Sequence, residues 1–338
     1  MKIFYIIFLF TLIINESYAN MELKPAHYDG KRFYNQEPHT NTFMDFLKWR
    51  WERNTPDWPE WVENNLKPNI EPKVEGKIKV TYINHETFLI QVAGLNILTD
   101  PIYSERASPV SFAGPKRVHA PGIPFESLPK IDIVLVSHSH YDHLDIPTIE
   151  MLVKRDNPVI YTGLKLGKYI KKNADAKIVH DMDWWQTMEN KGIQITYTPA
   201  HHWSARGLFD RSKTLWGSFV IEYKGKKLYF AGDTAWGVHF EQLASKYGNF
   251  DIALLPIGTY EPRWFMKNSH INPEEAVMAH ITMKSKLSIG MHFNCFANLA
   301  EDRYNQAVEE LAESLTRHNI DKTSFIAPLP GQEFEIAE

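Results

Sequence analysis

Residues 137–145 carry three imidazoles and a carboxylate within six positions, in the pattern His-x-His-x-Asp-His. The four side chains belong to His138, His140, Asp142 and His143. The run contains no lysine or arginine, and ligand-type side chains at this density repel and desolvate one another unless a cation holds them together. Because alternate residues of an extended segment point to opposite sides, the first two are expected to face one metal ion and the last two a second one. The alternative is a polar turn with chance histidines, which the density of the pattern disfavours.

An apolar stretch at residues 131–136 leads directly into this run and predicts a buried strand that ends in the ligand cluster. Other strands are predicted at residues 77–83, 87–92, 96–99, 158–162, 193–198, 218–223, 227–231, 250–255 and 287–291. Helices are predicted at residues 147–155, 164–173, 239–247, 273–283 and 302–318. Two β-rich halves with helices between and after them predict the α/β class, as an αβ/βα sandwich of two stacked sheets covered by helices.

The composition fits a globular chain and gives no reason to expect nucleic acid as a partner. The 338 residues are 43% hydrophobic and 13% aromatic, enough for a sizeable core in one large domain or two. The net charge of −4 supplies no general attraction for a polyanion. The only cysteine is Cys295, so an intramolecular disulfide is excluded and stability is expected to come from packing and metal.

The N-terminus has the pattern of a secretory signal at residues 1–19. Lys2 precedes an apolar run at residues 3–14, and the small-residue site Ser17-Tyr18-Ala19 predicts cleavage after Ala19, with an uncleaved anchor as the alternative. The expected location is the periplasm, reached by secretion across the inner membrane, with membrane association left open. Residues 20–72, rich in Trp, Pro and charge, are expected to form an irregular N-terminal extension with one short helix.

Three further ligand positions fall directly after predicted strands, where side chains from different strands meet at one rim. They are the pair His201-His202, then Asp233 and His292. The expected sets are His138, His140 and a histidine of the pair at one metal, Asp142, His143 and His292 at the other, and Asp233 between them. Nitrogen and oxygen ligands without thiolates suit two zinc ions, with manganese or iron as alternatives.

Long strings along the chain resemble one family in particular. Leu-Thr-Asp-Pro-Ile-Tyr-Ser-Glu-Arg-Ala-Ser-Pro at residues 98–109, Gly-Pro-Lys-Arg at 114–117, Leu-Trp-Gly-Ser at 215–218, Phe-Ala-Gly-Asp-Thr at 230–234 and Pro-Ile-Gly-Thr-Tyr-Glu-Pro-Arg-Trp-Phe-Met-Lys at 256–267 carry the resemblance. The chain is similar there to the N-acylphosphatidylethanolamine-hydrolysing phospholipase D family of the metallo-β-lactamase superfamily. The likeness covers roughly residues 73–330, in strings too long and uncommon to match by chance.

The resemblance implies that residues 73–338 form a hydrolase domain of the metallo-β-lactamase fold. Its implied activity is that of a two-zinc phosphodiesterase, which cleaves N-acylphosphatidylethanolamine to phosphatidic acid and N-acylethanolamine with hydroxide as the nucleophile. It selects His202 over His201 as the ligand. His270 matches a family histidine close to the reacting phosphate. From the chemistry of phosphodiester cleavage, Asp142 and Asp233 are expected to hold the hydroxide as metal ligands, and His270 to donate to the phosphate or the leaving oxygen. The implied partner is a phospholipid, with peripheral membrane contact expected and a homodimer left open.

Two departures from the family concern the substrate pocket. Asn84-His85-Glu86 stands where relatives commonly carry Gly-His-Ala, and residues 292–296 differ from the usual sequence after the last ligand. Alternative functions are another hydrolase of the superfamily, such as a sugar-phosphate lactonase or a nuclease, and a non-catalytic metal- or lipid-binding protein. Two alternative roles are considered for Asp100 and Asp145. Each either orients a ligand imidazole or makes ordinary turn and cap contacts.

The aromatic residues of the N-terminal extension also allow two interpretations. Seven aromatic or leucine side chains are interleaved with cations: Phe43, Phe46, Leu47, Trp49, Trp51, Trp58 and Trp61, with Lys48, Arg50 and Arg53. This composition is typical of a segment at a membrane interface, where it would rim the substrate entrance. The alternative is that these aromatics pack the extension onto the catalytic domain.

Overall fold

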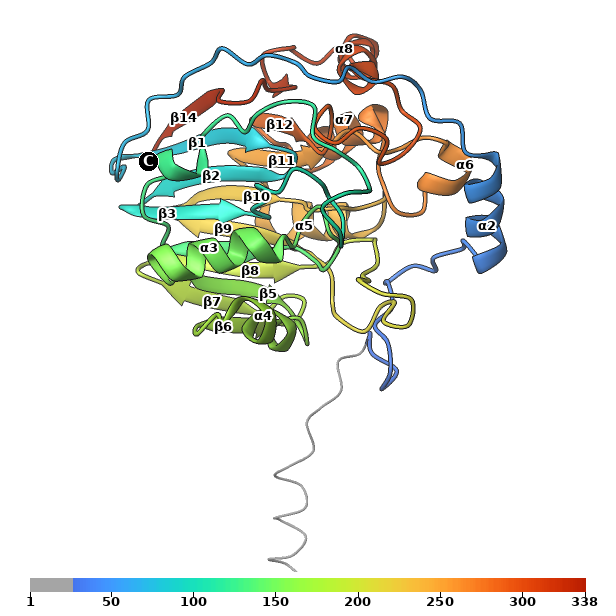
Figure 1. The fold of residues 1–338 in the computed structure, drawn as a ribbon. Helices are drawn as coiled ribbons and strands as arrows, with labels where there is room; N and C mark the ends of the chain where they lie inside the picture. The colour runs from blue at the N-terminus through green and yellow to red at the C-terminus, as the bar shows by residue number, and fades with distance from the viewer. Residues whose placement is uncertain (1–26) are drawn as a thin grey trace, which may run out of the picture.

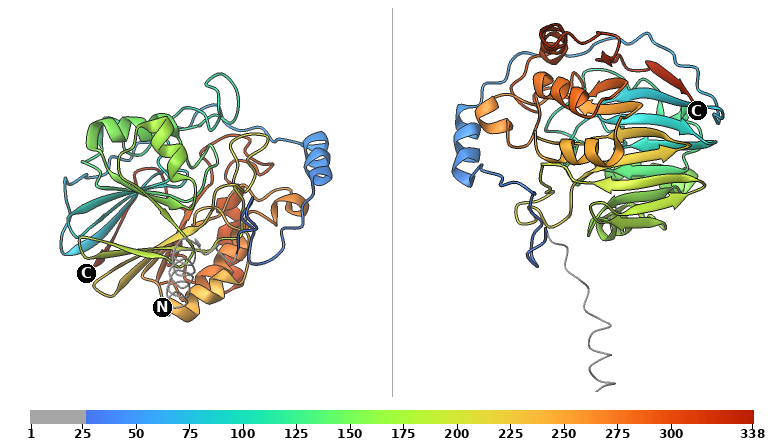
Figure 2. Two further views of the ribbon diagram at one scale, coloured as in Figure 1. Left: turned by 90° about the horizontal axis from the view of Figure 1, so that it is seen from below. Right: turned by 180° about the vertical axis from the view of Figure 1, so that it is seen from behind.

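The computed structural model describes residues 27–338, so the predicted signal sequence lies outside the described residues. Two seven-stranded sheets stack face to face, with helices on the outer face of each (Figures 1 and 2). The first sheet has the order β14 (Glu333–Ala337), β1 (Lys77–Asn84), β2 (Thr87–Val92), β3 (Leu95–Thr99), β4 (Ile133–Val136), β5 (Val159–Gly163), β6 (Val179–Met182). The second has the order β13 (Phe325–Ile326), β12 (Leu287–Met291), β11 (Ile252–Pro256), β10 (Lys226–Phe230), β9 (Ser218–Tyr223), β8 (Ile193–Thr198), β7 (Thr187–Asn190). The predicted αβ/βα sandwich is confirmed.

The helices are divided between the two outer faces. α3 (Ile146–Asp156) and α4 (Gly167–Ala174) lie on the first sheet, and α5 (His239–Tyr247) and α7 (Pro273–Thr282) on the second (Figure 2). α8 (Gln306–Arg317) packs against α7. α7 begins where the sequence predicts, because Asn272 and Glu275 form a capping box and Pro273 occupies the first turn. Within residues 27–338, no helix has both the length and the apolar character that a bilayer-spanning segment needs.

β4 explains why the strand that leads to the metal-ligand run is apolar at every position. Its side chains alternate between two cores: Ile133 and Leu135 pack between the sheets, and Val134 and Val136 pack beneath α3 and α4. A strand buried on both faces needs a continuous apolar run. Replacing Leu135 by alanine would cost about 2–5 kcal/mol of folding free energy, the usual range for a fully buried leucine.

The described part of the N-terminal extension contains one helix, α2 (Phe43–Glu52), as expected. From its end, residues 53–76 run as an extended segment over the outside of the sandwich to β1 (Figure 1). Backbone-directed hydrogen bonds fasten this segment: the Trp58 indole donates to the Asp302 carbonyl at 3.0 Å, and the Asn64 amide to the Pro330 carbonyl at 2.7 Å. α2 itself contacts the short helix α6 (Arg263–Met266).

Some elements differ from the sequence-based expectation. β6, β7 and β14 were not predicted, because their sequences, such as Val-His-Asp-Met in β6, mix polar and apolar residues without a clear period. The helix predicted from residue 302 begins at Gln306, because the Asp302 carboxylate accepts the backbone N–H groups of Thr259, Tyr260 and Glu261. The helix predicted from residue 164 begins at Gly167, since the Leu164 N–H pairs with the Met182 carbonyl instead.

Candidate metal centre

Five strands end at the same end of the sandwich, and each is followed by a ligand-type side chain. β1, β4, β8, β10 and β12 lead to His85, the 137–145 run, His202, Asp233 and His292. All of these side chains are at least largely buried. The carboxyl ends of strands from both sheets therefore converge on one site, as the sequence predicts for everything except His85.

The first group of potential ligands consists of His138, His140, His202 and Asp233. The Nδ1 atom of His140 lies 2.8 Å from His138 Nε2 and 3.2 Å from His202 Nε2. Asp233 Oδ2 lies 3.6 Å from His138 Nε2 and 3.5 Å from His202 Nε2. Burial lowers the pKa of all three imidazoles, to about 4 for His140. These imidazoles are therefore neutral near pH 7, the state in which a ring nitrogen binds a metal.

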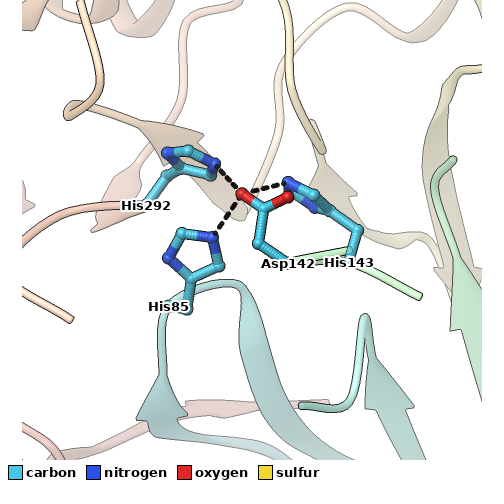
Figure 3. Close-up of side chains that lie close together, drawn as sticks. All are labelled: His85, Asp142, His143 and His292. Carbon is cyan, nitrogen blue, oxygen red and sulfur yellow. Dashed lines mark hydrogen bonds and ion pairs between the residues drawn. The ribbon is translucent and has the colours of Figure 1, made fainter. Parts of the chain in front are cut away.

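The second group consists of His85, Asp142, His143 and His292, and Figure 3 shows three imidazoles around one carboxylate. Asp142 Oδ2 lies 3.2 Å from His85 Nε2, 3.4 Å from His143 Nε2 and 3.3 Å from His292 Nε2 (Figure 3). Burial alone would raise the pKa of Asp142, but the imidazoles, His143 foremost, outweigh it and hold the pKa well below the usual value.

Asp233 contacts both groups. Besides its contacts in the first group, its Oδ2 atom lies 3.0 Å from His143 Nε2 and its Oδ1 atom 3.1 Å from His292 Nε2. Burial alone would raise its pKa, but His292 and His143 outweigh burial and hold the pKa well below the usual value. One carboxylate is thus placed to bridge two cations.

A second, independent observation shows that the residues fit two divalent ions. Several buried ligand-type atoms have no hydrogen-bond partner among the described residues: His140 Nε2, His143 Nε2, His292 Nε2, Asp233 Oδ1 and His270 Nδ1. Buried polar groups without partners are rare in native proteins and each one requires an explanation. A pair of cations bound between these side chains would satisfy most of them, and nitrogen and oxygen donors of this kind suit zinc, manganese or iron.

Groups behind the ligands fix their orientation. The His202 ring uses Nδ1 for the Ser269 carbonyl at 2.8 Å, which directs Nε2 into the centre. Asp100 Oδ2 lies 2.8 Å from His143 Nδ1 and also accepts a hydrogen bond from the Ser137 hydroxyl. Of the two roles open for Asp100, the structure therefore shows the orienting one.

Asp145 has the other role. Its carboxylate accepts the N–H groups of Tyr103 at 3.2 Å and Ser104 at 3.0 Å, and the Thr148 hydroxyl at 2.6 Å. It fastens the loop after β3 to the start of α3 and contacts no ligand imidazole. The same residue type in the same ligand-rich region thus serves two different purposes.

His270 lies at the edge of the centre, in the loop after α6. Its Nδ1 atom is 3.5 Å from Asp233 Oδ1, and its ring centroid is 5.1 Å from that of His202 and 5.4 Å from that of His292. His201, in contrast, belongs to neither ligand group, and its ring stacks with that of His39 at a centroid distance of 6.4 Å. The structure thus gathers the seven predicted ligands with His270 beside them, and leaves His201 outside.

Sequence reasoning missed two residues of the centre, His85 and Glu86. They form the two-residue turn between β1 and β2, and His85 adopts a left-handed backbone conformation with φ of 46°. This turn directs the His85 imidazole to Asp142 and the Glu86 carboxylate to within 3.3 Å of His143 Nδ1. The available signal was their position after a strand, the same position that identifies the other ligands.

A cavity of about 590 Å³ opens from the metal centre toward α2. Both apolar and polar side chains line it. The apolar lining comprises Phe43, Phe46 and Trp49 of α2 with Phe265, Met266 and Leu299, and the polar lining includes His39, Asn41, Ser269 and Arg211. Trp49 is only 8% exposed and stacks on Phe265 at 5.1 Å, so this tryptophan packs α2 onto the domain.

Comparisons with known proteins agree with this geometry. The family model described as "Beta-lactamase superfamily domain" matches residues 95–293. The "N-acyl-phosphatidylethanolamine-hydrolyzing phospholipase D 1" of Caenorhabditis elegans is 37% identical over 276 residues, covering 78% of this chain and 77% of that protein.

More distant proteins share the fold or a broader description. A "UPF0173 metal-dependent hydrolase" of Thermococcus onnurineus is 29% identical over 77% of this chain and all of that protein. The solved structure of Igni18, a "novel metallo hydrolase" from Ignicoccus hospitalis, superposes with a TM-score of 0.58 at 22% identity, over 78% of this chain and 99% of the other. At that identity the structural likeness supports the fold alone.

Proposed function

Because this chain belongs to the metallo-β-lactamase superfamily, in the family of the N-acylphosphatidylethanolamine-hydrolysing phospholipases D, and is a metal-dependent hydrolase, we propose that it hydrolyses N-acylphosphatidylethanolamine to phosphatidic acid and N-acylethanolamine. The observation that carries the proposal is a pair of ligand groups sharing Asp233 in a cavity that is lined in part by apolar side chains. The paired groups suit a phosphodiester, and the apolar side chains suit acyl chains.

Two divalent ions, with zinc the proposed metal, would supply a nucleophile from water near neutral pH and neutralise charge on the phosphoryl oxygens. The chain's own groups perform the remaining tasks. The Asp142 carboxylate, which is 13% exposed, contacts the imidazoles of the second group, and the buried Asp233 carboxylate contacts imidazoles of both groups. His270 lines the cavity beside Asp233 and is placed to donate a proton to the phosphate or to the departing ethanolamine oxygen.

The wall chemistry favours a lipid over a sugar phosphate or a polynucleotide. Phe43, Phe46 and Phe265 offer apolar contacts in the cavity for acyl chains. The Arg211 guanidinium, which stacks over Trp203 at 4.0 Å, supplies a positive charge in the same cavity for the phosphate. A sugar phosphate would leave the apolar side chains exposed to water, and the net charge of −4 gives no general attraction for a polynucleotide.

We further propose that the mouth of the cavity docks on a phospholipid bilayer. Exposed apolar side chains belong to the two segments that line it: Leu208 and Phe209, in the loop after His202, are 92% and 82% exposed, and Trp51 of α2 is 92% exposed. α2 and this loop lie at the same end of the sandwich (Figure 1). Apolar exposure of this extent marks interaction surfaces.

Cations flank these apolar side chains. Lys48 and Arg50 lie on α2, and Arg211 and Lys213 follow the Leu208-Phe209 tip. Apolar tips with neighbouring cations suit an anionic membrane surface, where the apolar groups enter the headgroup layer and the cations contact phosphates. A periplasmic location, as the N-terminal pattern predicts, would give the protein access to such a surface.

The proposed activity is tested by incubating the purified chain with defined phospholipids and measuring headgroup release together with bound metal. Release of N-acylethanolamine and phosphatidic acid, lost on chelation and restored by zinc, supports the proposal. No release from any N-acylated phospholipid by a protein that holds two ions per chain would contradict it. Asp321→Asn, which alters an exposed turn where the carboxylate accepts the Thr323 N–H, is the matched control for Asp233→Asn.

A further inference from the structure

Glu86 is a carboxylate with no assigned role, fully enclosed beside the metal centre. It occupies the turn between β1 and β2, its exposed fraction is 0%, and neither side-chain oxygen has a hydrogen-bond partner among the described residues. Its ion-pair neighbour is His143, whose Nδ1 atom lies 3.3 Å from Glu86 Oε2, and within residues 27–338 no lysine or arginine lies at ion-pair distance. An enclosed carboxylate without donors is costly for the folded protein unless a cation compensates it.

Asp100 prevents His143 from compensating Glu86 fully. His143 Nδ1 lies closer to Asp100 Oδ2, at 2.8 Å, than to Glu86 Oε2, at 3.3 Å, and Asp100 also accepts the Ser137 N–H at 2.7 Å. Asp100 is therefore well satisfied, while Glu86 remains a second carboxylate behind the same imidazole. An imidazole backed by carboxylates is a more basic metal ligand.

In the first ligand group, no carboxylate bonds directly to the Nδ1 atom of His138 or His202. Behind His138 lies the Ser137 hydroxyl, 2.9 Å from Nδ1, and behind His202 lies the Ser269 carbonyl, 2.8 Å from Nδ1. Both are neutral acceptors, whereas the imidazole of His143 in the second group has two carboxylates behind it. The two groups share Asp233, so this difference in the surrounding charge distinguishes them.

We propose that Glu86 is a positioning residue that acts through His143 as the counter-charge of the second metal site, the site formed by His85, Asp142, His143 and His292. It raises the affinity of that site for a divalent cation. In return, the folded chain is stabilised by the cation, because in the metal-free protein the Glu86 carboxylate has only the His143 imidazole beside it, which it shares with Asp100. This role of Glu86 requires a cation in the second site and is the same whichever substrate the enzyme hydrolyses.

Glu86→Gln keeps the size of the side chain and removes its charge. Competition with a chelator should show one zinc ion weakened at least tenfold while the other stays within threefold of wild type. The metal-free variant should also melt at a higher temperature than the metal-free wild type, with a smaller gain on adding zinc. Glu86→Asp, which keeps the charge, should retain the wild-type affinities within threefold.

The matched control is Asp251→Asn, which alters a buried carboxylate at the opposite end of β11, bonded to the Lys227 N–H and to Lys286. It should lower the melting temperature with and without metal and leave both affinities unchanged. The proposal is overturned if Glu86→Gln behaves like this control, or if it weakens both ions equally. If Glu86→Gln does not fold, Glu86→Ala replaces it in the same titration, and unchanged zinc affinities there also overturn the proposal.

Discussion

The Asp233 carboxylate lies 3.0 Å from the Nε2 atom of His143, although the two residues come from different sheets. Asp233 follows β10 and His143 belongs to the loop after β4, so the contact spans the space between the two stacked sheets. Asp233 also approaches His138 and His202. The sandwich thus places one carboxylate between two sets of imidazoles.

Replacing Asp233 by asparagine should remove the charge that both ligand groups share. We expect turnover to fall by at least about a hundredfold, since even supporting contacts at metal sites are worth 10–100-fold. Metal analysis should show fewer than two ions per chain. Turnover within tenfold of wild type, with both ions retained, would mean that Asp233 does not bridge them.

The adjacent histidines 201 and 202 should behave differently. His202→Ala removes a ring whose Nε2 atom lies in the first ligand group, so it should abolish metal-dependent turnover and release one ion. His201→Ala removes a ring outside both groups and should reduce turnover only modestly. An inactive His201→Ala variant beside an active His202→Ala variant would reverse the assignment.

His270 should affect chemistry and leave metal binding intact. His270→Ala is expected to lower turnover by about 10²–10⁴-fold, the usual contribution of a general acid, with two ions still bound. The measurement is steady-state turnover with metal analysis of the same sample. Loss of an ion in this variant would reassign His270 as a ligand, a role its 3.5 Å distance from Asp233 would permit.

The bilayer proposal predicts a selective loss at membranes. Trp51→Ser combined with Phe209→Ser removes two highly exposed side chains outside the cavity and should weaken binding to anionic vesicles at least tenfold, since each buried apolar side chain contributes about 1.5–3 kcal/mol. Hydrolysis of a water-soluble phosphodiester should be unchanged.

Two controls accompany this double variant. Leu329→Ser, at another exposed leucine, should bind vesicles like wild type. Trp49→Ser should lower the melting temperature, because Trp49 packs on Phe265. Equal vesicle binding by the double variant and wild type would contradict the proposed docking surface.

Much of the fold was predictable because its signals are local. The strands at residues 87–92, 193–198, 218–223 and 287–291 and the helix at 239–247 have the predicted bounds, since each is a periodic or fully apolar run between turn residues. β14 was not predictable in this way. Its position beside β1 depends on pairing between the two ends of the chain, Lys77 with Ala337 for example, and its own residues alternate weakly.

In the metal centre, too, some residues were predictable from local sequence signals and others were not. His138, His202, Asp233 and His292 stand after recognisable strands, and the structure brings them together. The orientation of His85 and Glu86 depends on the left-handed backbone at His85, which no side-chain period reveals. The separate roles of Asp100 and Asp145 likewise depend on which loop reaches each carboxylate.

The most direct test of the central claim is hydrolysis of N-acylphosphatidylethanolamine in ¹⁸O-labelled water, with both products analysed by mass spectrometry. Attack of water on phosphorus forms a new P–O bond, breaks the bond from phosphorus to the ethanolamine oxygen, and transfers a proton to that oxygen. The account predicts one ¹⁸O in the phosphate of phosphatidic acid and none in N-acylethanolamine. Label in N-acylethanolamine, or release of a different pair of products, would contradict it.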